Sequence, residues 1–283
     1  MSDRKPVDLV GTGWLAAHLD DDGVRVVDAT WTPPGEERSG RDLYNTDHIA
    51  GTVFWDIDFI ADSANPLPHM LPDEATFARR MEGLGIGNDT FVIAYDAFGI
   101  YSAARVWWML RCFGHDAVGI LDGGLPKWKA EDRPVDAFPP LRFDTGFTAR
   151  RRPALVRSME EVRENIDSGA AQLLDARSAG RFKGTDPEPR KGVRPGHIPG
   201  SLNLPFDRLL DASDKTVLQP DALGDEFRRA GVDVDKPVIA SCGSGITACV
   251  LALGLHMAGH RDVAVYDGSW SEWGAGEDNP IET

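Results

Sequence analysis

The stretch VIASCGSGITACVLAL, residues 238–253, is the most informative part of the chain. A short apolar run ends at Cys242, a loop of small residues follows, and an Ala- and Leu-rich run begins near Ala248. This order is typical of a buried strand, a tight turn and a helix in a parallel α/β sheet. Loops at the carboxyl ends of parallel strands commonly carry functional residues, so the stretch predicts a functional loop at residues 242–247.

Cys242 is placed to act as a nucleophile. The main-chain N–H groups of such a loop, together with the positive end of the following helix, would face its sulfur. This environment stabilises a thiolate, which is the reactive form of cysteine. The alternative interpretation is a buried cysteine that only ends a strand. The glycines on both sides of Ser244 favour the reactive loop, because glycine permits the backbone conformations that a tight loop needs.

The chain repeats itself at an offset of 145 to 149 residues. The matched segments occur in the same order in both halves: 26–30 with 173–177, 48–51 with 197–200, 85–86 with 231–232, 92–96 with 238–242, 122–124 with 267–269, and Trp128 with Trp273. A fixed offset over so many segments indicates a duplicated domain. Asp96 stands where the second copy has Cys242, so the duplication predicts one catalytic half and one supporting half.

Each half alternates short apolar strands with helices. This pattern predicts an α/β fold with two tandem domains, each a mainly parallel sheet flanked by helices on both faces. We place the non-catalytic domain at residues 1–135, a linker at 136–154 and the catalytic domain at 155–283. Four prolines between positions 134 and 153, mixed with charged residues, are typical of a stiff surface segment and identify the linker.

The composition indicates a globular protein with an acidic balance. Of the 283 residues, 42% are hydrophobic and 27% are charged, and the net charge is −15. This charge disfavours nucleic acid and anionic membrane surfaces as partners, and an anionic substrate would need a locally basic pocket. The apolar stretches are too short to span a bilayer, and no apolar signal core follows Met1. Three cysteines make no disulfide framework, so we expect a cytoplasmic protein.

A cluster of basic residues lies in the second half. Its members fall within 18 residues: Arg177, Arg181, Lys183, Arg190, Lys191 and Arg194. Glycines and prolines among them predict a loop. Such a loop could clamp an anion, because a guanidinium group binds a carboxylate through two parallel hydrogen bonds. The alternative is a solvated loop whose charges pair with Asp186 and Glu188, and the spacing alone leaves both interpretations open.

His48 and Asp42 lie in a loop of the first half. An Asp–His pair could relay a proton, with Ser244 as its hydroxyl partner. The alternative is that His48 fixes the turn before Gly51. The repeat favours this structural role, because His197 occupies the same place in the other half.

The other two cysteines are predicted to be core residues. Cys112 follows a Trp- and Leu-rich run, and Cys249 lies inside the helix that follows the Cys242 loop. No pair of cysteines has the spacing of a zinc site, and no phosphate-binding glycine loop occurs. We therefore expect neither a metal nor another cofactor.

These motifs resemble those of the tandem-rhodanese sulfurtransferases, and the resemblance covers nearly the whole chain. It rests on the loop at 242–248, on residues 180–190 and 195–200, and on the aromatic-rich segments 101–110 and 266–270. The Cys-Gly-Ser-Gly loop is similar to that of family members that act on 3-mercaptopyruvate. In the members that use thiosulfate, the resemblance implies, basic residues come just after the cysteine.

The resemblance also implies roles for individual residues. Cys242 would become a persulfide, and Arg181 and Arg190 would bind the substrate. The residues that form the loop around the sulfur would be Gly243, Ser244, Gly245, Ile246 and Thr247. Asp42 and His48 would complete a relay with Ser244. The match around Asp42 is loose and Asp47 is a rival, and Ala50 stands where the family usually has proline.

The activity implied by the resemblance is transfer of sulfur from 3-mercaptopyruvate to Cys242, and from there to a thiol acceptor such as thioredoxin or to cyanide. The protein would be a monomer. A thiosulfate:cyanide sulfurtransferase with the same fold is the nearest alternative, and a non-enzymatic sulfur carrier or docking module is another. A cysteine phosphatase is disfavoured, because its loop needs a closing arginine to hold phosphate, and Ala248 and Cys249 stand at that end here.

Overall fold

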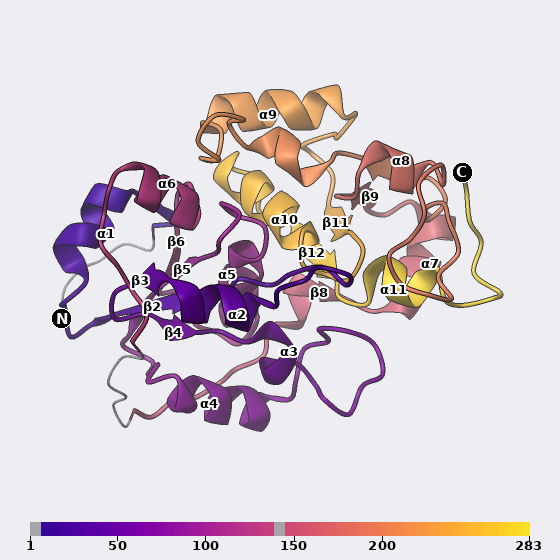
Figure 1. Cartoon of the computed structure of the whole chain (residues 1–283). Helices are drawn as coiled ribbons and strands as arrows, with labels where there is room; N and C mark the ends of the chain where they lie inside the picture. Colours follow the sequence, from indigo (N-terminus) through magenta and orange to yellow (C-terminus); the bar gives the residue numbers. More distant parts are fainter. Residues whose placement is uncertain (1–6, 139–144) are drawn as a thin grey trace.

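The computed structural model describes residues 7–138 and 145–283, in which two similar α/β units follow each other along the chain (Figure 1). The sequence after Met1 is predicted to contain no apolar signal core, and its first residues lie outside the described ranges. Pro139 and Pro140 of the predicted linker also lie outside them. The exact domain boundaries stay predictions.

The first unit comprises β1 (Leu9–Val10), α1 (Thr12–His18), β2 (Val24–Asp28), α2 (Gly40–Thr46), β3 (His48–Ile49), β4 (Val53–Phe54), α3 (Ile57–Ile60), α4 (Glu74–Gly83), β5 (Phe91–Tyr95), α5 (Ala103–Cys112), β6 (Val118–Leu121), α6 (Gly124–Ala130) and β7 (Val135–Asp136). The second unit comprises η1 (Pro153–Leu155), β8 (Val156–Arg157), α7 (Met159–Ser168), β9 (Gln172–Asp175), α8 (Ala179–Phe182), β10 (Leu202–Asn203), η2 (Phe206–Leu209), α9 (Pro220–Arg229), β11 (Val238–Ser241), α10 (Ala248–Met257), β12 (Val263–Tyr266) and α11 (Ser269–Trp273).

The two five-stranded sheets have equivalent topologies. The first has the order β1-β6-β5-β2-β4 and the second the order β8-β12-β11-β9-β10, so the central strands are β5 and β11. All neighbouring strands in these two sheets are parallel. Every residue of β5 and of β11 is buried, as expected for strands covered on both faces. The predicted duplication and the predicted fold class are both confirmed.

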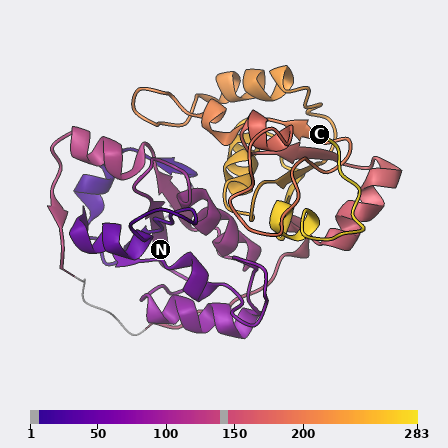
Figure 2. The same cartoon turned by 45° about the vertical axis from the view of Figure 1, so that its right-hand side comes forward.

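The helices that follow the two central strands meet where the units join. Helices α5 and α10 pack against each other (Figures 1 and 2), and one hydrophobic core continues through both units. This core contains Trp108 and Leu110 of α5 as well as Val250 and Leu251 of α10. Because the helices meet, the loops that precede them lie at the junction of the two units.

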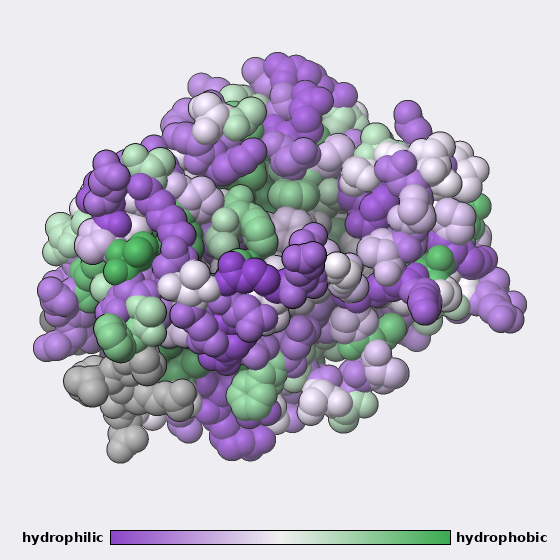
Figure 3. Space-filling view, viewed as in Figure 1, coloured by the Kyte–Doolittle hydropathy of each residue, from purple (hydrophilic) through white to green (hydrophobic). Residues whose placement is uncertain are grey.

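The surface is consistent with the acidic composition. Figure 3 shows a mainly hydrophilic face, with apolar residues visible in the hollow between the two units. None of the helices in the described ranges is long and apolar enough to cross a bilayer.

Asp96 occupies the position in the first unit that Cys242 has in the second. Its carboxyl group is fully buried and accepts hydrogen bonds from the N–H groups of Phe98 (2.8 Å), Ser102 (2.7 Å) and Ala103 (2.8 Å). Burial raises the pKa of Asp96, and these N–H donors oppose the shift. The first unit thus fills its loop with an acceptor of its own, which keeps these buried N–H groups satisfied.

We predict that Asp96→Ala destabilises the protein by about 3 kcal/mol or more, because each buried donor left unsatisfied costs roughly 1–3 kcal/mol. The control is Asp73→Ala, which removes an exposed N-cap of α4 bonded to the N–H of Thr76 and should cost about 1 kcal/mol. Urea unfolding of both variants measures the difference. Equal losses of stability in the two variants would mean that the Asp96 carboxyl group is not required to satisfy the N–H groups of its loop.

Candidate active site

The loop at residues 242–247 connects the central strand β11 to helix α10. Cys242 is 2% exposed, and its N–H group donates to the hydroxyl of Ser269 (3.2 Å). The carbonyl oxygen of Cys242 accepts from the N–H of Trp270 (3.0 Å), and that of Gly243 accepts from both the N–H (2.8 Å) and the hydroxyl (2.6 Å) of Ser271. The start of α11 therefore fixes the loop on one side.

The same loop has unused donors. Within the described residues, no protein group accepts a hydrogen bond from the N–H groups of Gly243, Ser244, Gly245, Ile246 or Thr247. The ten-residue helix α10 begins directly after them, and its N-terminal end adds a positive electrostatic potential. In the first unit such donors are satisfied by Asp96, so the second unit offers them to an anion, which the thiolate of Cys242 or a bound substrate can supply.

Gly245 has a conformational role rather than a place in the cavity. Its φ is +78°, and a side-chain Cβ would lie 2.7 Å from the carbonyl oxygen of Asp267. Its own carbonyl oxygen accepts from Nη1 of Arg105 (3.0 Å) and from Sγ of Cys249 (3.2 Å). The cavity includes Gly243, Ser244, Ile246 and Thr247 but, in the described structure, not Gly245. The prediction that Gly245 contacts the substrate is therefore not supported by its position.

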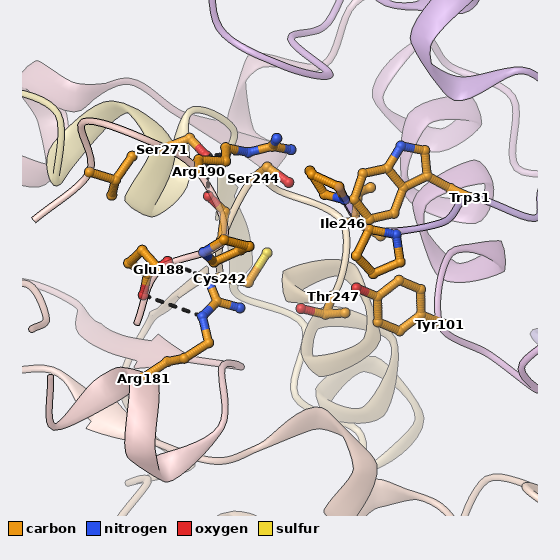
Figure 4. Close-up of a pocket in the computed structure, with 15 residues that line it drawn as sticks. Trp31, Tyr101, Arg181, Glu188, Arg190, Cys242, Ser244, Ile246, Thr247 and Ser271 are labelled. Atoms are coloured by element: carbon orange, nitrogen blue, oxygen red, sulfur yellow. Dashed lines mark hydrogen bonds and ion pairs between the residues drawn. The ribbon is translucent and has the colours of Figure 1, made fainter. Parts of the chain in front are cut away.

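Cys242 faces a small cavity between the two units (Figure 4). Its volume is about 130 Å³, well below the roughly 300–1,000 Å³ typical of pockets for drug-sized ligands. The first unit contributes Trp31, Pro33, Pro34 and Tyr101, and the second contributes the loop and both predicted arginines. The size suits a molecule of only a few heavy atoms.

Arg181 and Arg190 both reach this cavity, but they differ in their partners. Arg181 is bound to Glu188 through Nη2–Oε2 (2.6 Å) and Nε–Oε1 (3.3 Å), as Figure 4 shows. Arg190 donates from Nε to the hydroxyl of Ser271 (3.2 Å). Burial lowers the pKa of Arg190, and the carboxylate of Asp58 opposes this shift. The charge of Arg190 is thus less neutralised than that of Arg181, and its remaining donors are available to an anion.

The other members of the basic cluster do not form the cavity. Arg177 is buried and pairs with Asp175 (2.6 Å) and Glu188 (2.8 Å). Arg194 donates to the carbonyl oxygens of Gly274 and Asn279. Both arginines therefore hold the loop in place, and the anion clamp is reduced to two of the six basic residues.

The structure does not bring His48 and Asp42 to the Cys242 loop. The ring nitrogens of buried His48 contact the carbonyl oxygens of Tyr44 (2.8 Å) and Phe138 (3.2 Å). Asp42 forms a capping box with Ser39 at the start of α2. The rival residue Asp47 forms an ion pair with Lys129. The assignment of a relay to His48 and Asp42 is wrong, because their partners anchor α2 and β3 within the first unit.

A different Asp–His pair lies behind the loop. Nδ1 of His69 contacts the carbonyl oxygen of Ser244 (3.1 Å), and Nε2 contacts Oδ1 of Asp58 (3.1 Å). The bond to His69 is the largest cause of the lowered pKa of Asp58. Both partners of the ring are acceptors, so His69 can serve both only with a proton on each nitrogen. His69 also has a positive φ of 64°, a strained conformation that its surroundings must hold.

Sequence reasoning missed this pair because the repeat gives no guide to it. Asp58 and His69 lie between the matched segments at 48–51 and 85–86, where the second half has no equivalent histidine. The signal that could have identified His69 is its isolation: it follows Pro66-Leu67-Pro68 in a loop, and it has no repeat partner to suggest a structural role.

Three further side chains clarify the chemistry of the site. Tyr101 lines the cavity, and its hydroxyl donates to no protein group in the described structure. Burial raises the pKa of Tyr101 to about 12, so the phenol stays protonated near neutral pH. Burial also raises the pKa of Cys249 to about 12 and that of Cys112 well above its usual range. Those two thiols therefore pack in the core, as predicted, and Cys242 is the cysteine at the cavity.

Comparison with known proteins identifies the family. The protein-family model of the rhodanese-like domain matches the sequence twice, at residues 12–131 and at residues 158–275. The chain belongs to the rhodanese family. This confirms the resemblance drawn from the loop motifs, and it places the Cys242 cavity between two rhodanese domains.

Similar proteins cover nearly the whole chain. It is 42% identical to the thiosulfate/3-mercaptopyruvate sulfurtransferase 1, mitochondrial, of Arabidopsis thaliana, over 100% of this chain and 79% of the relative. It is 43% identical to the 3-mercaptopyruvate sulfurtransferase of Escherichia coli strain K12, over 97% of each chain. Among solved structures, the chain is similar to the crystal structure of SseA from Escherichia coli, which is described for the fold and catalytic mechanism of 3-mercaptopyruvate sulfotransferases. The two superpose with a TM-score of 0.85 at 40% sequence identity, over 93% of this chain and 98% of that one.

We predict that Gly245→Ala is more destabilising than Gly243→Ala in the same loop. A Cβ at position 245 would meet main-chain atoms at a positive φ, whereas one at 243 would meet only the end of the flexible Arg181 side chain at 3.0 Å. We expect a loss of about 1–3 kcal/mol for Gly245→Ala. Chemical unfolding of both variants tests this, and a greater loss for Gly243→Ala would contradict the assigned loop conformation.

Proposed function

We propose that this protein transfers sulfur from 3-mercaptopyruvate, through a persulfide on Cys242, to a thiol acceptor or cyanide, and releases pyruvate. The observation that carries the proposal is the position of the Cys242 thiol, at a loop with unused N–H donors and beside two guanidinium groups in a small cavity. Relatives of this chain that are 42–43% identical bear the names of sulfurtransferases acting on this donor.

In the first half-reaction, the thiolate of Cys242 attacks the sulfur of the donor. An S–S bond forms and the C–S bond breaks, and its electron pair passes to carbon as the enolate of pyruvate. Arg190 and Arg181 hold the carboxylate and carbonyl oxygen, so they also stabilise the negative charge that develops on the enolate. Protonation at carbon then gives pyruvate, and Cys242 keeps the transferred sulfur.

We assign the supply of this proton to solvent, passed on by the hydroxyl of Ser244, and we assign the positioning of Ser244 to His69, in place of His48. Ser244 lines the cavity, and the ring of His69 contacts its carbonyl oxygen. The carboxylate of Asp58 contacts the other ring nitrogen and fixes the orientation of the ring. Tyr101, protonated near neutral pH, adds a hydrogen-bond donor from the opposite wall.

In the second half-reaction, an acceptor attacks the outer sulfur of the persulfide and regenerates the Cys242 thiolate. A small anion such as cyanide fits the cavity directly, and a protein thiol such as that of thioredoxin would have to enter from its mouth. We propose a monomer in the cytoplasm, as expected from the sequence, although one relative is named as mitochondrial. Two half-reactions through a covalent intermediate predict ping-pong kinetics.

The charge of the cavity favours mercaptopyruvate over thiosulfate. Glu188 neutralises one guanidinium group, so the two arginines leave about one net positive charge before Cys242 ionises. This balance suits a monoanion with a carboxylate better than a dianion. The loop supplies no cation next to Cys242. A thiosulfate sulfurtransferase remains the second candidate, since one relative's name includes both donors.

We predict that 3-mercaptopyruvate adds one sulfur atom to the protein, and that Cys242→Ser abolishes this addition. Intact-protein mass spectrometry measures it. Steady-state rates with both donors then test specificity: kcat/KM for mercaptopyruvate should exceed that for thiosulfate by about tenfold or more, equivalent to ~1.4 kcal/mol. An unchanged mass would refute sulfur transfer, and a preference for thiosulfate would favour the second candidate. A persulfide without turnover in the presence of a dithiol would indicate a carrier.

We also predict that two histidine variants differ in their effect on kcat. His69→Asn should lower kcat by about 10²-fold, because Ser244 loses its position at the reacting atoms. It should also lower the free energy of unfolding by about 1–3 kcal/mol, because its buried ring makes two polar contacts. His48→Asn should leave kcat near the wild-type value but lower the free energy of unfolding by about 1–3 kcal/mol, because a buried hydrogen-bonded ring is lost. Kinetics and urea unfolding of both variants decide between the two assignments; a selective loss of kcat in His48→Asn would restore the sequence-based one.

A further inference from the structure

Arg105 is a charged residue in an otherwise apolar helix. It lies on α5 of the first unit, between alanine, valine and tryptophan residues, and its side chain is completely buried. The Cζ atom of its guanidinium group lies over the ring of Trp108, 4.4 Å from the ring centroid. Burying such a charge is costly unless it is paired and hydrogen-bonded, so its partners indicate what the residue is for.

Arg105 donates hydrogen bonds to two parts of the candidate active site, the Cys242 loop and the segment that begins at His69. Nη1 donates to the carbonyl oxygen of Gly245 in the Cys242 loop (3.0 Å). Nη2 donates to the carbonyl oxygen of His69 (2.5 Å) and to Oδ1 of Asp267 (2.7 Å). One side chain of the first unit is therefore bonded both to the Cys242 loop of the second unit and to the main chain of His69 in the first unit.

Asp267 completes the arrangement. It is 3% exposed, and while Oδ1 pairs with Arg105, Oδ2 accepts from the N–H of Leu71 (2.8 Å). The segment 69–71 is thus held at two points, on the carbonyl oxygen of His69 and on the N–H of Leu71. The carboxylate also offsets burial strongly enough that the pKa of Arg105 is raised.

The hydrogen bonds of Arg105 and Asp267 explain how His69 keeps a strained conformation. His69 has a φ of 64°, a conformation that non-glycine residues adopt only where the surroundings enforce it. Its ring reaches Ser244 only if the segment 69–71 stays fixed relative to the loop. Hydrogen bonds from Arg105 to both segments supply that constraint across the junction of the units.

We propose that Arg105, paired with Asp267, is a positioning residue that sets the Cys242 loop and the Asp58–His69 pair in their reactive arrangement. It touches neither the cavity nor the substrate and acts through Gly245 and His69. The forked guanidinium group is required, because a lysine ammonium is a compact charge that cannot reach all three oxygens in one plane. The catalytic part of this proposal rests on the proposed function.

The test compares Arg105→Lys and Asp267→Asn with wild type. For both variants we expect kcat for sulfur transfer to fall by about 10²-fold, the effect of small displacements in an active site. KM should stay within about threefold, because Arg181 and Arg190 bind the donor independently of Arg105. The control is Lys127→Ala, which removes another ion pair between the units, to Asp214 (3.1 Å), away from the cavity; it should behave as wild type in kcat and KM.

Alkylation of Cys242 by iodoacetamide is measured in parallel, because it reports loop geometry without a sulfur donor. We expect it to slow markedly in Arg105→Lys and Asp267→Asn but not in Lys127→Ala. If wild type shows no sulfur transfer, the proposed function fails, and the alkylation rates still decide whether Arg105 positions the loop. Wild-type kinetics and alkylation in folded Arg105→Lys would overturn the proposal. The proposal would also be overturned if the losses in kcat and in alkylation rate only matched the fraction of unfolded protein. If Arg105→Lys does not fold, the same criteria are applied to Asp267→Asn.

Discussion

The structure depends on satisfying main-chain N–H groups in a tight, buried loop after the central strand of each sheet. Buried donors without partners are costly, so each loop needs an acceptor. The first unit supplies one permanently in the carboxyl group of Asp96. The second unit has the shorter side chain of Cys242 at the same place and leaves several donors unused. The same backbone arrangement is thus filled by its own side chain in one domain and left open in the other.

This difference explains the division of labour between the domains. With its own loop filled, the first unit has no nucleophile, but the same region delivers Tyr101 to the wall of the neighbouring cavity. It also provides Trp31, and it holds His69 behind Ser244. Because the helices after both loops pack together, these groups meet at the junction of the units. The second domain by itself would lack the contacts that Trp31, Tyr101 and His69 make with its cavity and loop.

The features that sequence could predict are those encoded within one segment. The strand–loop–helix around Cys242, the duplication and the loop with Arg181 and Arg190 are all local patterns, and the structure contains each of them. His69 lies 175 residues from Ser244 along the chain, and Arg105 lies 140 residues from Gly245. No local pattern encodes such contacts. The matched histidines at 48 and 197 mark a turn that the two units share, and neither lies at the site.

The same contacts tie the chemistry to the packing of the two domains. Cys242 and Arg190 belong to the second unit and keep their positions through α11, with Ser269 and Ser271 as anchors. His69 and Tyr101 belong to the first unit, so their distances to the sulfur change with any shift of one unit against the other. In the proposed mechanism, donor binding relies mainly on the first set, whereas the proton supply relies on the second. A disturbance at the junction should therefore affect turnover more than donor affinity, which is the opposite of what loss of either cavity arginine would do.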